Sequence, residues 1–326
     1  MKKITVIITV VIAILVIAGS YLFRTNSKRF VDETFWVGLN SSVSISPDDR
    51  HIVFAYNGDI FVAGIDGSDI KQLTFPRDEY HVSISPEFSP DGANILFISY
   101  PKKFDKPHTR SRIFVMDING KNLKQVTEED LVSWATFSAD SKKIFFLGVD
   151  NYGQSDAREA YSVNINGADR KQLTDIKAYS MGDLSASVDG KELYFTEYHL
   201  KATFYRLSLD DTTQMKPLHS GEYTGNYCLS PDKKYVVFVE VSKESRSKSP
   251  FEYELFVMDM ATGQVRQLTT LHGEAKNPRF FHNQDKLIFF RALNWPTRNP
   301  RYELMTVDLD GTHLQEIKLL FESAKS

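Results

Sequence analysis

The feature that most constrains this chain is a turn sequence that recurs along its length. Residues 89–101 read SPDGANILFISYP, and residues 46–58 read SPDDRHIVFAYNG. Alignment on this turn gives six copies, spaced 43 to 52 residues apart. The copies begin at Ser46, Ser89, Ser138, Ser187, Ser230 and, in a degenerate form, His282. A period of roughly 40 to 50 residues is typical of repeat architectures in which each copy is one supersecondary unit.

Each copy contains four short segments with the composition of β-strands. The second segment reads HIVFAY, NILFIS, KIFFLG, ELYFTE, YVVFVE and LIFFRA, and the fourth reads KQLT in its most regular form. Such β-branched and aromatic runs, bounded by Gly, Asp, Asn and Pro, predict strands. One four-stranded sheet cannot bury both of its faces, whereas six sheets in a ring bury each face against a neighbour. The sequence therefore predicts an all-β fold, a six-bladed β-propeller of four-stranded blades over residues 41–326.

The recurring turn residues have a structural explanation. Pro47 and Pro90 preset φ for the first turn position, and Gly92 tolerates a positive φ. An aspartate occupies the same position in five of the six copies, namely Asp48, Asp91, Asp140, Asp189 and Asp232. Its carboxylate can accept local backbone N–H groups in an Asx turn. We therefore expect these aspartates to stabilise the turns rather than to perform catalysis.

The first 30 residues predict an N-terminal transmembrane helix, which is either a membrane anchor or a cleaved signal segment. The uncharged run Ile4–Phe23 is long enough to span a bilayer. Small residues at 18–20 leave cleavage open. Basic residues lie on both sides of the run, Lys2 and Lys3 before it and Arg24, Lys28 and Arg29 after it, so they do not decide the orientation. Residues 31–40 are expected to be a linker.

Composition excludes several classes of function. The single cysteine, Cys228, cannot form an internal disulfide or a CxxC metal site. Five basic and no acidic residues lie within the first 30 positions, so the remainder is more acidic than the net charge of −3 indicates. This balance argues against nucleic-acid binding. We expect a monomer without a cofactor.

The SPDG turns, followed by segments such as IFVMD and KQLT, resemble the TolB-type, or WD-like, β-propeller repeat family. The resemblance covers about residues 41–319, and the chain lacks the N-terminal α/β domain of TolB. Such repeats occur in periplasmic interaction proteins, in the propellers of prolyl oligopeptidases and in oligogalacturonate lyases. The N-terminal apolar run predicts a single-pass protein of the cell membrane, and the resemblance implies that its propeller is extracytoplasmic, either periplasmic or extracellular. It also implies a cell-envelope protein, a peptide or a glycan as the binding partner.

Residues for catalysis are sparse. The G-x-S-x-G nucleophile motif of the oligopeptidases does not occur in the sequence. Two EYH segments place Glu79 near His81 and Glu197 near His199, but the propeller would hold them apart. We therefore expect no catalytic residue, no metal site and a non-catalytic binding module. The alternative is a lyase-like propeller enzyme that acts on acidic saccharides with a divalent metal, and the sequence leaves residual enzymatic activity open.

The loops between the second and third strands offer a partner-binding site. These loops are long and basic in the second, fifth and sixth copies, whereas the first copy has only AYNGD. Long loops on either side of a short one predict a notch with basic and aromatic walls, a composition typical of interaction hot spots. The predicted partner-binding residues are Tyr100, Lys102, Lys103, Lys106, Arg110, Arg291, Trp295, Arg298, Arg301 and Tyr302. The connections from each fourth strand to the next copy are expected to be acidic, with Asp183 and Glu274 among their exposed side chains.

Overall fold

The computed structural model describes residues 39–75, 80–101, 111–128, 131–149, 157–247, 249–297 and 300–321. The described residues belong to one compact unit. In the described residues no helix is both long and apolar enough to cross a membrane. The predicted N-terminal helix and most of the predicted linker lie outside the described residues.

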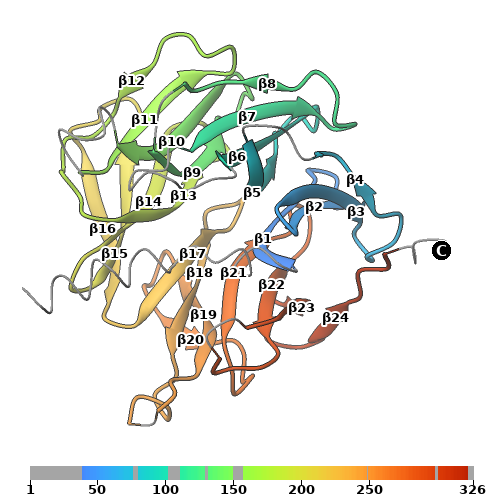
Figure 1. Cartoon of the computed structure of the whole chain (residues 1–326). Coiled ribbons are helices and arrows are strands. Elements are labelled where there is room, and N and C mark those ends of the chain that lie inside the picture. The colour runs from blue at the N-terminus through green and yellow to red at the C-terminus, as the bar shows by residue number, and fades with distance from the viewer. Residues whose placement is uncertain are drawn as a thin grey trace, which may run out of the picture. The chain divides into compact units, whose positions relative to one another are not determined.

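The predicted six-bladed propeller is confirmed: six four-stranded antiparallel sheets surround a common axis (Figure 1). The innermost strands are β1 (Leu39–Ile45), β5 (Tyr80–Phe88), β9 (Leu131–Phe137), β13 (Met181–Ala186), β17 (Thr224–Leu229) and β21 (Ala275–Phe280). The second strands are β2 (His51–Tyr56), β6 (Asn94–Pro101), β10 (Lys143–Val149), β14 (Glu192–Tyr198), β18 (Tyr235–Val241) and β22 (Lys286–Ala292).

The third and outermost strands complete each blade in chain order. The third strands are β3 (Asp59–Gly64), β7 (Arg112–Asp117), β11 (Glu159–Asn164), β15 (Ala202–Ser208), β19 (Tyr253–Asp259) and β23 (Tyr302–Asp308). The outermost strands are β4 (Lys71–Gln72), β8 (Lys124–Gln125), β12 (Lys171–Gln172), β16 (Met215–Gly221), β20 (Val265–Gln267) and β24 (Gln315–Ile317). Each blade is built from one continuous stretch of chain, so blades 1 and 6 meet without exchanging a strand.

The hydrophobic core lies between the blades. Six clusters of buried side chains occur, and each joins two adjacent blades. The cluster that closes the ring contains Val43, Ile52 and Phe54 from blade 1 with Ile288 and Phe290 from blade 6. Burial of both sheet faces in this way is the physical reason that a chain of such repeats forms a closed ring.

The repeated turn has the Asx geometry that the sequence predicts. In blade 1 the Ser46 hydroxyl donates to Asp48 Oδ1 at 2.6 Å and accepts the His51 N–H at 2.9 Å. Asp48 Oδ1 also accepts the Arg50 N–H at 3.2 Å. The same serine–aspartate bond recurs in blades 2 to 5. These bonds satisfy the polar groups of the turn, so the turn aspartates have a structural role.

The residue after the turn aspartate contacts the turn of the preceding blade. Lys233 Nζ lies 2.7 Å from Asp189 Oδ2, and Ser141 Oγ accepts the Asp91 N–H at 3.1 Å. The same position in blade 1 is Asp49, which has a φ of 57°. Its two carboxylate oxygens accept the N–H groups of His282 and Asn283, each at 2.8 Å. Asp49 therefore provides polar contacts that close the ring.

The fourth segment, KQLT, is also structural. Thr74 Oγ1 accepts the Ile60 N–H at 2.9 Å and donates to Asp59 at 2.9 Å, while the Gln72 side chain donates to the Thr74 carbonyl. Equivalent threonine bonds to the third strand occur in blades 2, 3 and 5. Blade 4 has MKPL at this place, without the threonine, and its outermost strand β16 extends to seven residues.

Candidate partner-binding face

One end of the propeller carries the connections from second to third strands and from fourth strands to the next blade. We call this end the upper face. In the parts of these connections that the structure describes, five large apolar side chains are between 43% and 86% exposed: Phe75, Tyr179, Leu200, Tyr223 and Leu293. The connections at the opposite end, the lower face, expose Ile118, Val188 and Leu314. The upper face therefore displays the larger set of accessible apolar groups, a feature of interaction surfaces.

Four aromatic rings from blades 5 and 6 form one group on the upper face. We call Tyr223, Phe251, Tyr253 and Trp295 the aromatic cluster. The Tyr223 and Phe251 ring centroids lie 5.0 Å apart, and the Tyr253 ring meets Phe251 and Trp295 edge to face, at 6.5 and 5.9 Å. The Trp295 indole N–H donates to the Phe251 carbonyl at 2.8 Å, which fixes the loop of blade 6 against the loop of blade 5. Aromatic anchors of this kind are enriched in interaction hot spots.

An ion pair between the half-buried Lys276 and the buried Glu274 lies beside the aromatic cluster. Lys276 Nζ is 3.3 Å from Glu274 Oε1 and donates to the Tyr302 hydroxyl at 2.9 Å. The Tyr302 hydroxyl in turn donates to Glu274 Oε2 at 3.2 Å. Burial raises the pKa of the Tyr253 phenol, and the nearby Glu274 carboxylate adds to this shift. Glu274 is buried, so the expectation that it is an exposed loop acid is wrong.

Asp183 is likewise buried rather than exposed in a loop. It lies in β13, where its carboxylate accepts the Tyr198 hydroxyl proton at 2.5 Å. Its φ of 55° marks a one-residue bulge in which Asp183 and Leu184 of β13 oppose the single residue Phe195 of β14. Bulges with a positive φ occur at the matching residues Ser85, Asn226 and Asn277 of three other innermost strands. Short polar residues tolerate this conformation, so the bulges explain why four of the innermost strands carry a serine, an aspartate or an asparagine at this position.

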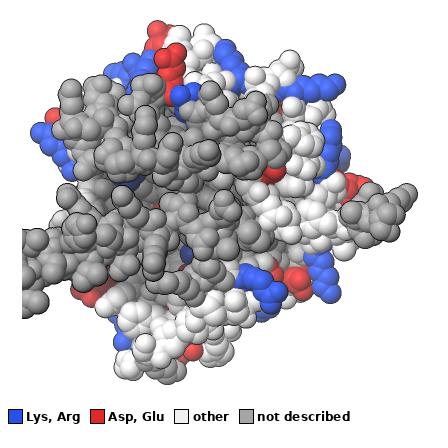
Figure 2. All heavy atoms as spheres, in the orientation of Figure 1, with Lys and Arg blue, Asp and Glu red and all other residues white. Residues whose placement is uncertain are grey.

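The residues predicted to line a notch over blade 1 have several environments. Trp295 packs toward blade 5, as described above, and Tyr302 lies beside Lys276. Tyr100 packs against the cluster between blades 2 and 3, where its hydroxyl is 3.4 Å from the Val132 carbonyl. Arg291 pairs with Glu303 of its own blade, and Arg301 is exposed. The other predicted residues, Lys102, Lys103, Lys106, Arg110 and Arg298, lie outside the described residues, so the notch stays a prediction. On the side shown in Figure 2, basic and acidic side chains are interspersed around the rim.

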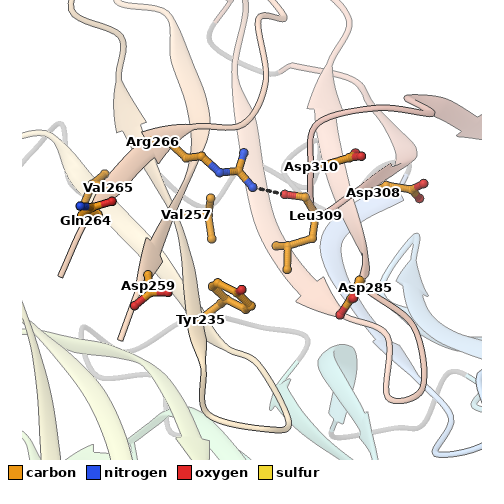
Figure 3. Close-up of a pocket in the computed structure, with 10 residues that line it drawn as sticks. All are labelled: Tyr235, Val257, Asp259, Gln264, Val265, Arg266, Asp285, Asp308, Leu309 and Asp310. Atoms are coloured by element: carbon orange, nitrogen blue, oxygen red, sulfur yellow. Dashed lines mark hydrogen bonds between the residues drawn. The ribbon is translucent and has the colours of Figure 1, made fainter. Parts of the chain in front are cut away.

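A second candidate, a cavity of about 610 Å³, lies between blades 5 and 6 on the lower face. Its wall contains four aspartates, which Figure 3 shows together with Arg266: Asp259, Asp285, Asp308 and Asp310. Arg266 donates to the Leu309 carbonyl, and Asp310 accepts the Thr312 hydroxyl and N–H groups within its own turn. An acidic saccharide would meet carboxylates here, so this cavity does not suit the lyase alternative. Among the described residues no group of three or more His, Cys, Asp or Glu side chains could hold a metal ion.

The repeat chemistry and the fold agree with the comparison to known families. The model of the TolB beta propeller domain matches residues 59–324. The chain belongs to the TolB beta-propeller family. A search of curated proteins found no match.

The solved structures that resemble this TolB-type propeller include several different kinds of protein. TolB from Acinetobacter baumannii is 21% identical with a TM-score of 0.61, and the match covers 86% of this chain and 63% of that one. An oligogalacturonate lyase in complex with manganese is 14% identical with a TM-score of 0.58, covering 82% and 77%. A chain of a nidogen/laminin complex is 13% identical with a TM-score of 0.61, and the match covers 82% of this chain and 92% of that one. At these identities the likeness establishes the fold alone.

Sequence reasoning missed most of the aromatic cluster. Trp295 was predicted at the site, but Tyr223, Phe251 and Tyr253 were not. The available signal was the pairing of long loops in two consecutive copies, VSKESRSKSPF and RALNWPTRNPRY. Long second-to-third-strand loops of adjacent blades lie at the same end of the propeller, so aromatic residues in them can meet.

Proposed function

We propose that this TolB-type propeller is a non-catalytic binding module, tethered to a membrane with the propeller outside the cytoplasm, whose upper face binds an envelope protein. The observation that carries the proposal is that the upper face exposes large apolar side chains, one of which, Tyr223, belongs to the aromatic cluster. A protein partner would bury these groups, and aromatic anchors surrounded by polar residues supply much of the energy of such interfaces.

The membrane tether rests on the uncharged run Ile4–Phe23. An alkaline phosphatase fusion after Ser326 is expected to be active because this enzyme folds in oxidising compartments. An inactive but stably expressed fusion, together with a fluorescent green-fluorescent-protein fusion at the same point, would place the propeller in the cytoplasm.

The binding face can be tested with a photo-cross-linking amino acid at Tyr223 of the full chain in native membranes. The protein that becomes cross-linked to the propeller is identified and then purified in its free form. The affinity of this partner for the propeller is then measured directly. Tyr223→Ser and Leu200→Ser are expected to weaken binding by roughly 5- to 30-fold each, as for side chains buried at an interface. Val188→Ser, on the lower face, is the matched control and should leave affinity unchanged. Equal affinity of all three variants would exclude the upper face as the site.

The basic notch over blade 1 belongs to the same proposal as an extension of the upper face. Its charges would act mainly on association rate and salt dependence. Exchange of Arg291 and Arg301 for glutamate is expected to slow association with the cross-linked protein. The control exchange uses Lys121 and Lys124, at the lower end of blade 2. If both pairs of variants associate at the same rate, the notch plays no part in binding.

The lyase alternative is supported by the similarity in fold to an oligogalacturonate lyase. It is tested by incubating the protein with polygalacturonate and Mn²⁺ and following the absorbance of the unsaturated product. Product formation above a heat-denatured control would show catalysis and overturn the non-catalytic proposal.

A further inference from the structure

The first strand places the entry of the chain into the propeller on the upper face. Leu39 of β1 pairs with Tyr56, the last residue of β2. The connection from β2 to β3 follows Tyr56 directly, and such connections lie on the upper face. At its other end, β1 leads from Ile45 into the Ser46 turn of the lower face. The chain therefore enters the propeller at its upper end.

The C-terminal end of the described chain lies beside this entry. The Phe321 ring centroid is 4.5 Å from that of Tyr56 and 5.8 Å from that of Phe61. Tyr56 is thus opposite the first described residue, Leu39, and in contact with the last, Phe321. The residues before position 39 are therefore joined to the propeller at the upper edge of blade 1.

Three of the exposed apolar side chains occupy the same place in the repeat as the entry to β1. Phe75, Tyr179 and Tyr223 lie in the connections that lead into the innermost strands β5, β13 and β17. The chain before Leu39 leads into the innermost strand β1 in the same way. A partner that buries these side chains therefore covers the end of the propeller to which the N-terminal part of the chain is attached.

The distance from this entry to the membrane has an upper limit. The uncharged run ends at Phe23, and 15 residues, 24–38, separate it from Leu39. A fully extended chain spans at most about 3.6 Å per residue, so this segment covers no more than about 55 Å. Whatever conformation residues 24–38 adopt, the upper edge of blade 1 stays within that distance of the bilayer that holds the anchor.

The charges around the upper end of blade 4 favour a protein over the lipid surface itself. Tyr179 and Leu200 are the most exposed of the large apolar side chains on the upper face. The charged side chains of the connections around them are all exposed and carry both signs: Asp175, Lys177, Lys201 and Glu222. Attraction to a lipid surface relies on clusters of Lys and Arg. Apolar groups within a polar rim are instead typical of protein interfaces.

We propose that the partner of the upper face is a protein of the same membrane as the anchor, bound beside this chain. The inference rests on the proposed function, which supplies the anchor and the protein partner, and it adds where that partner resides. A soluble protein, or a protein of a second membrane, would have to enter the limited space between the upper face and the bilayer. A protein that projects from the same bilayer meets this face directly, and confinement to one membrane raises the effective concentration of both.

The test mixes two populations of right-side-out membrane vesicles. One comes from unlabelled cells that contain the full chain with the photo-cross-linking amino acid at Tyr223. The other comes from cells that lack this protein and are labelled with heavy nitrogen, so that their copy of the partner differs in mass. After illumination, the mass of the cross-linked protein shows from which membrane it came. A partner of the same membrane should be at least about tenfold more abundant in the unlabelled than in the heavy form.

Two controls accompany the measurement. The same mixture dissolved in detergent before illumination should give both forms, because the restriction to one membrane is then removed. The full chain with the cross-linking amino acid at Val188, on the lower face, should not capture the partner.

The outcomes separate this inference from the proposed function. Comparable amounts of both forms from intact vesicles overturn the inference and leave the proposed function in place. A protein that is cross-linked in intact cells but is missing from washed vesicles is soluble, and this result also overturns the inference. If Tyr223 captures lipid or no protein at all, in cells as well as in vesicles, the proposed function itself fails.

Discussion

The ring closes through Asp49, and the substitution Asp49→Asn tests how much this contact contributes. The two carboxylate oxygens of Asp49 accept two different backbone N–H groups, from His282 and Asn283. An asparagine has one acceptor oxygen, so one of these N–H groups would face an amide NH₂ instead. Asparagine also tolerates the φ of 57° at this position, so backbone strain does not complicate the comparison.

The neighbouring residue supplies a matched control. Asp48 accepts both of its hydrogen bonds on a single oxygen, Oδ1, and an asparagine can keep both. Asp48→Asn makes the same change in charge one residue away and leaves the ring contact intact. Any general effect of removing a negative charge from this turn therefore appears in both variants.

The expected magnitudes differ clearly. Leaving a buried N–H group unsatisfied costs about 1 to 3 kcal/mol, and these two bonds are only part-buried, so we expect Asp49→Asn to lower the free energy of unfolding by about 1 kcal/mol. Asp48→Asn should lower it by less than about 0.5 kcal/mol, as expected for an exposed position that keeps its bonds. Equilibrium urea unfolding at pH 7 measures both losses. The slope of the unfolding free energy against urea concentration should be the same in the wild type and in both variants. Equal losses in the two variants would refute the assignment of Asp49 as a closing contact.

Three further predictions concern other parts of the fold. Gly67→Ala is expected to destabilise the protein by about 2 kcal/mol or more in urea unfolding, since Gly67 has a φ of +86° and an added Cβ would lie 2.2 Å from the Lys318 carbonyl oxygen. Thr174→Val should cost about 1 to 3 kcal/mol in the same assay, because it removes the hydroxyl that donates to the buried Glu159 carboxylate. Burial lowers the pKa of His219, so the neutral imidazole contributes to stability above pH 6.5 and this contribution is lost as pH falls. Between pH 7 and 5, His219→Gln should therefore lose less stability than the wild type. Thermal unfolding at these pH values measures the difference.

The sequence by itself determined the architecture and much of the local chemistry. The number of blades, the four strands of each and the role of the turn aspartates follow from the repeat, because each copy shows the same strand pattern and the same turn residues. These features depend on contacts within one copy, such as the hydrogen bond between Ser46 and Asp48, or on packing against the next copy of the repeat, which has the same strand pattern. Local contacts of this kind can be inferred from residue spacing.

Only the tertiary structure decided which side chains meet between blades. Glu87 and Arg279 are almost 200 residues apart in the chain, yet the closed ring places both on innermost strands, in the two blades that flank blade 1. The sequence places Asp183 and Glu274 in acidic connections, yet Asp183 lies in an inner-strand bulge and the Glu274 carboxylate is buried in an ion pair with Lys276. Tyr223, Phe251 and Trp295 come from three different connections and meet because adjacent blades present their loops at the same end. Bulges, ring closure and loop packing depend on the relative positions of whole blades, and residue spacing within one copy carries no information about those positions.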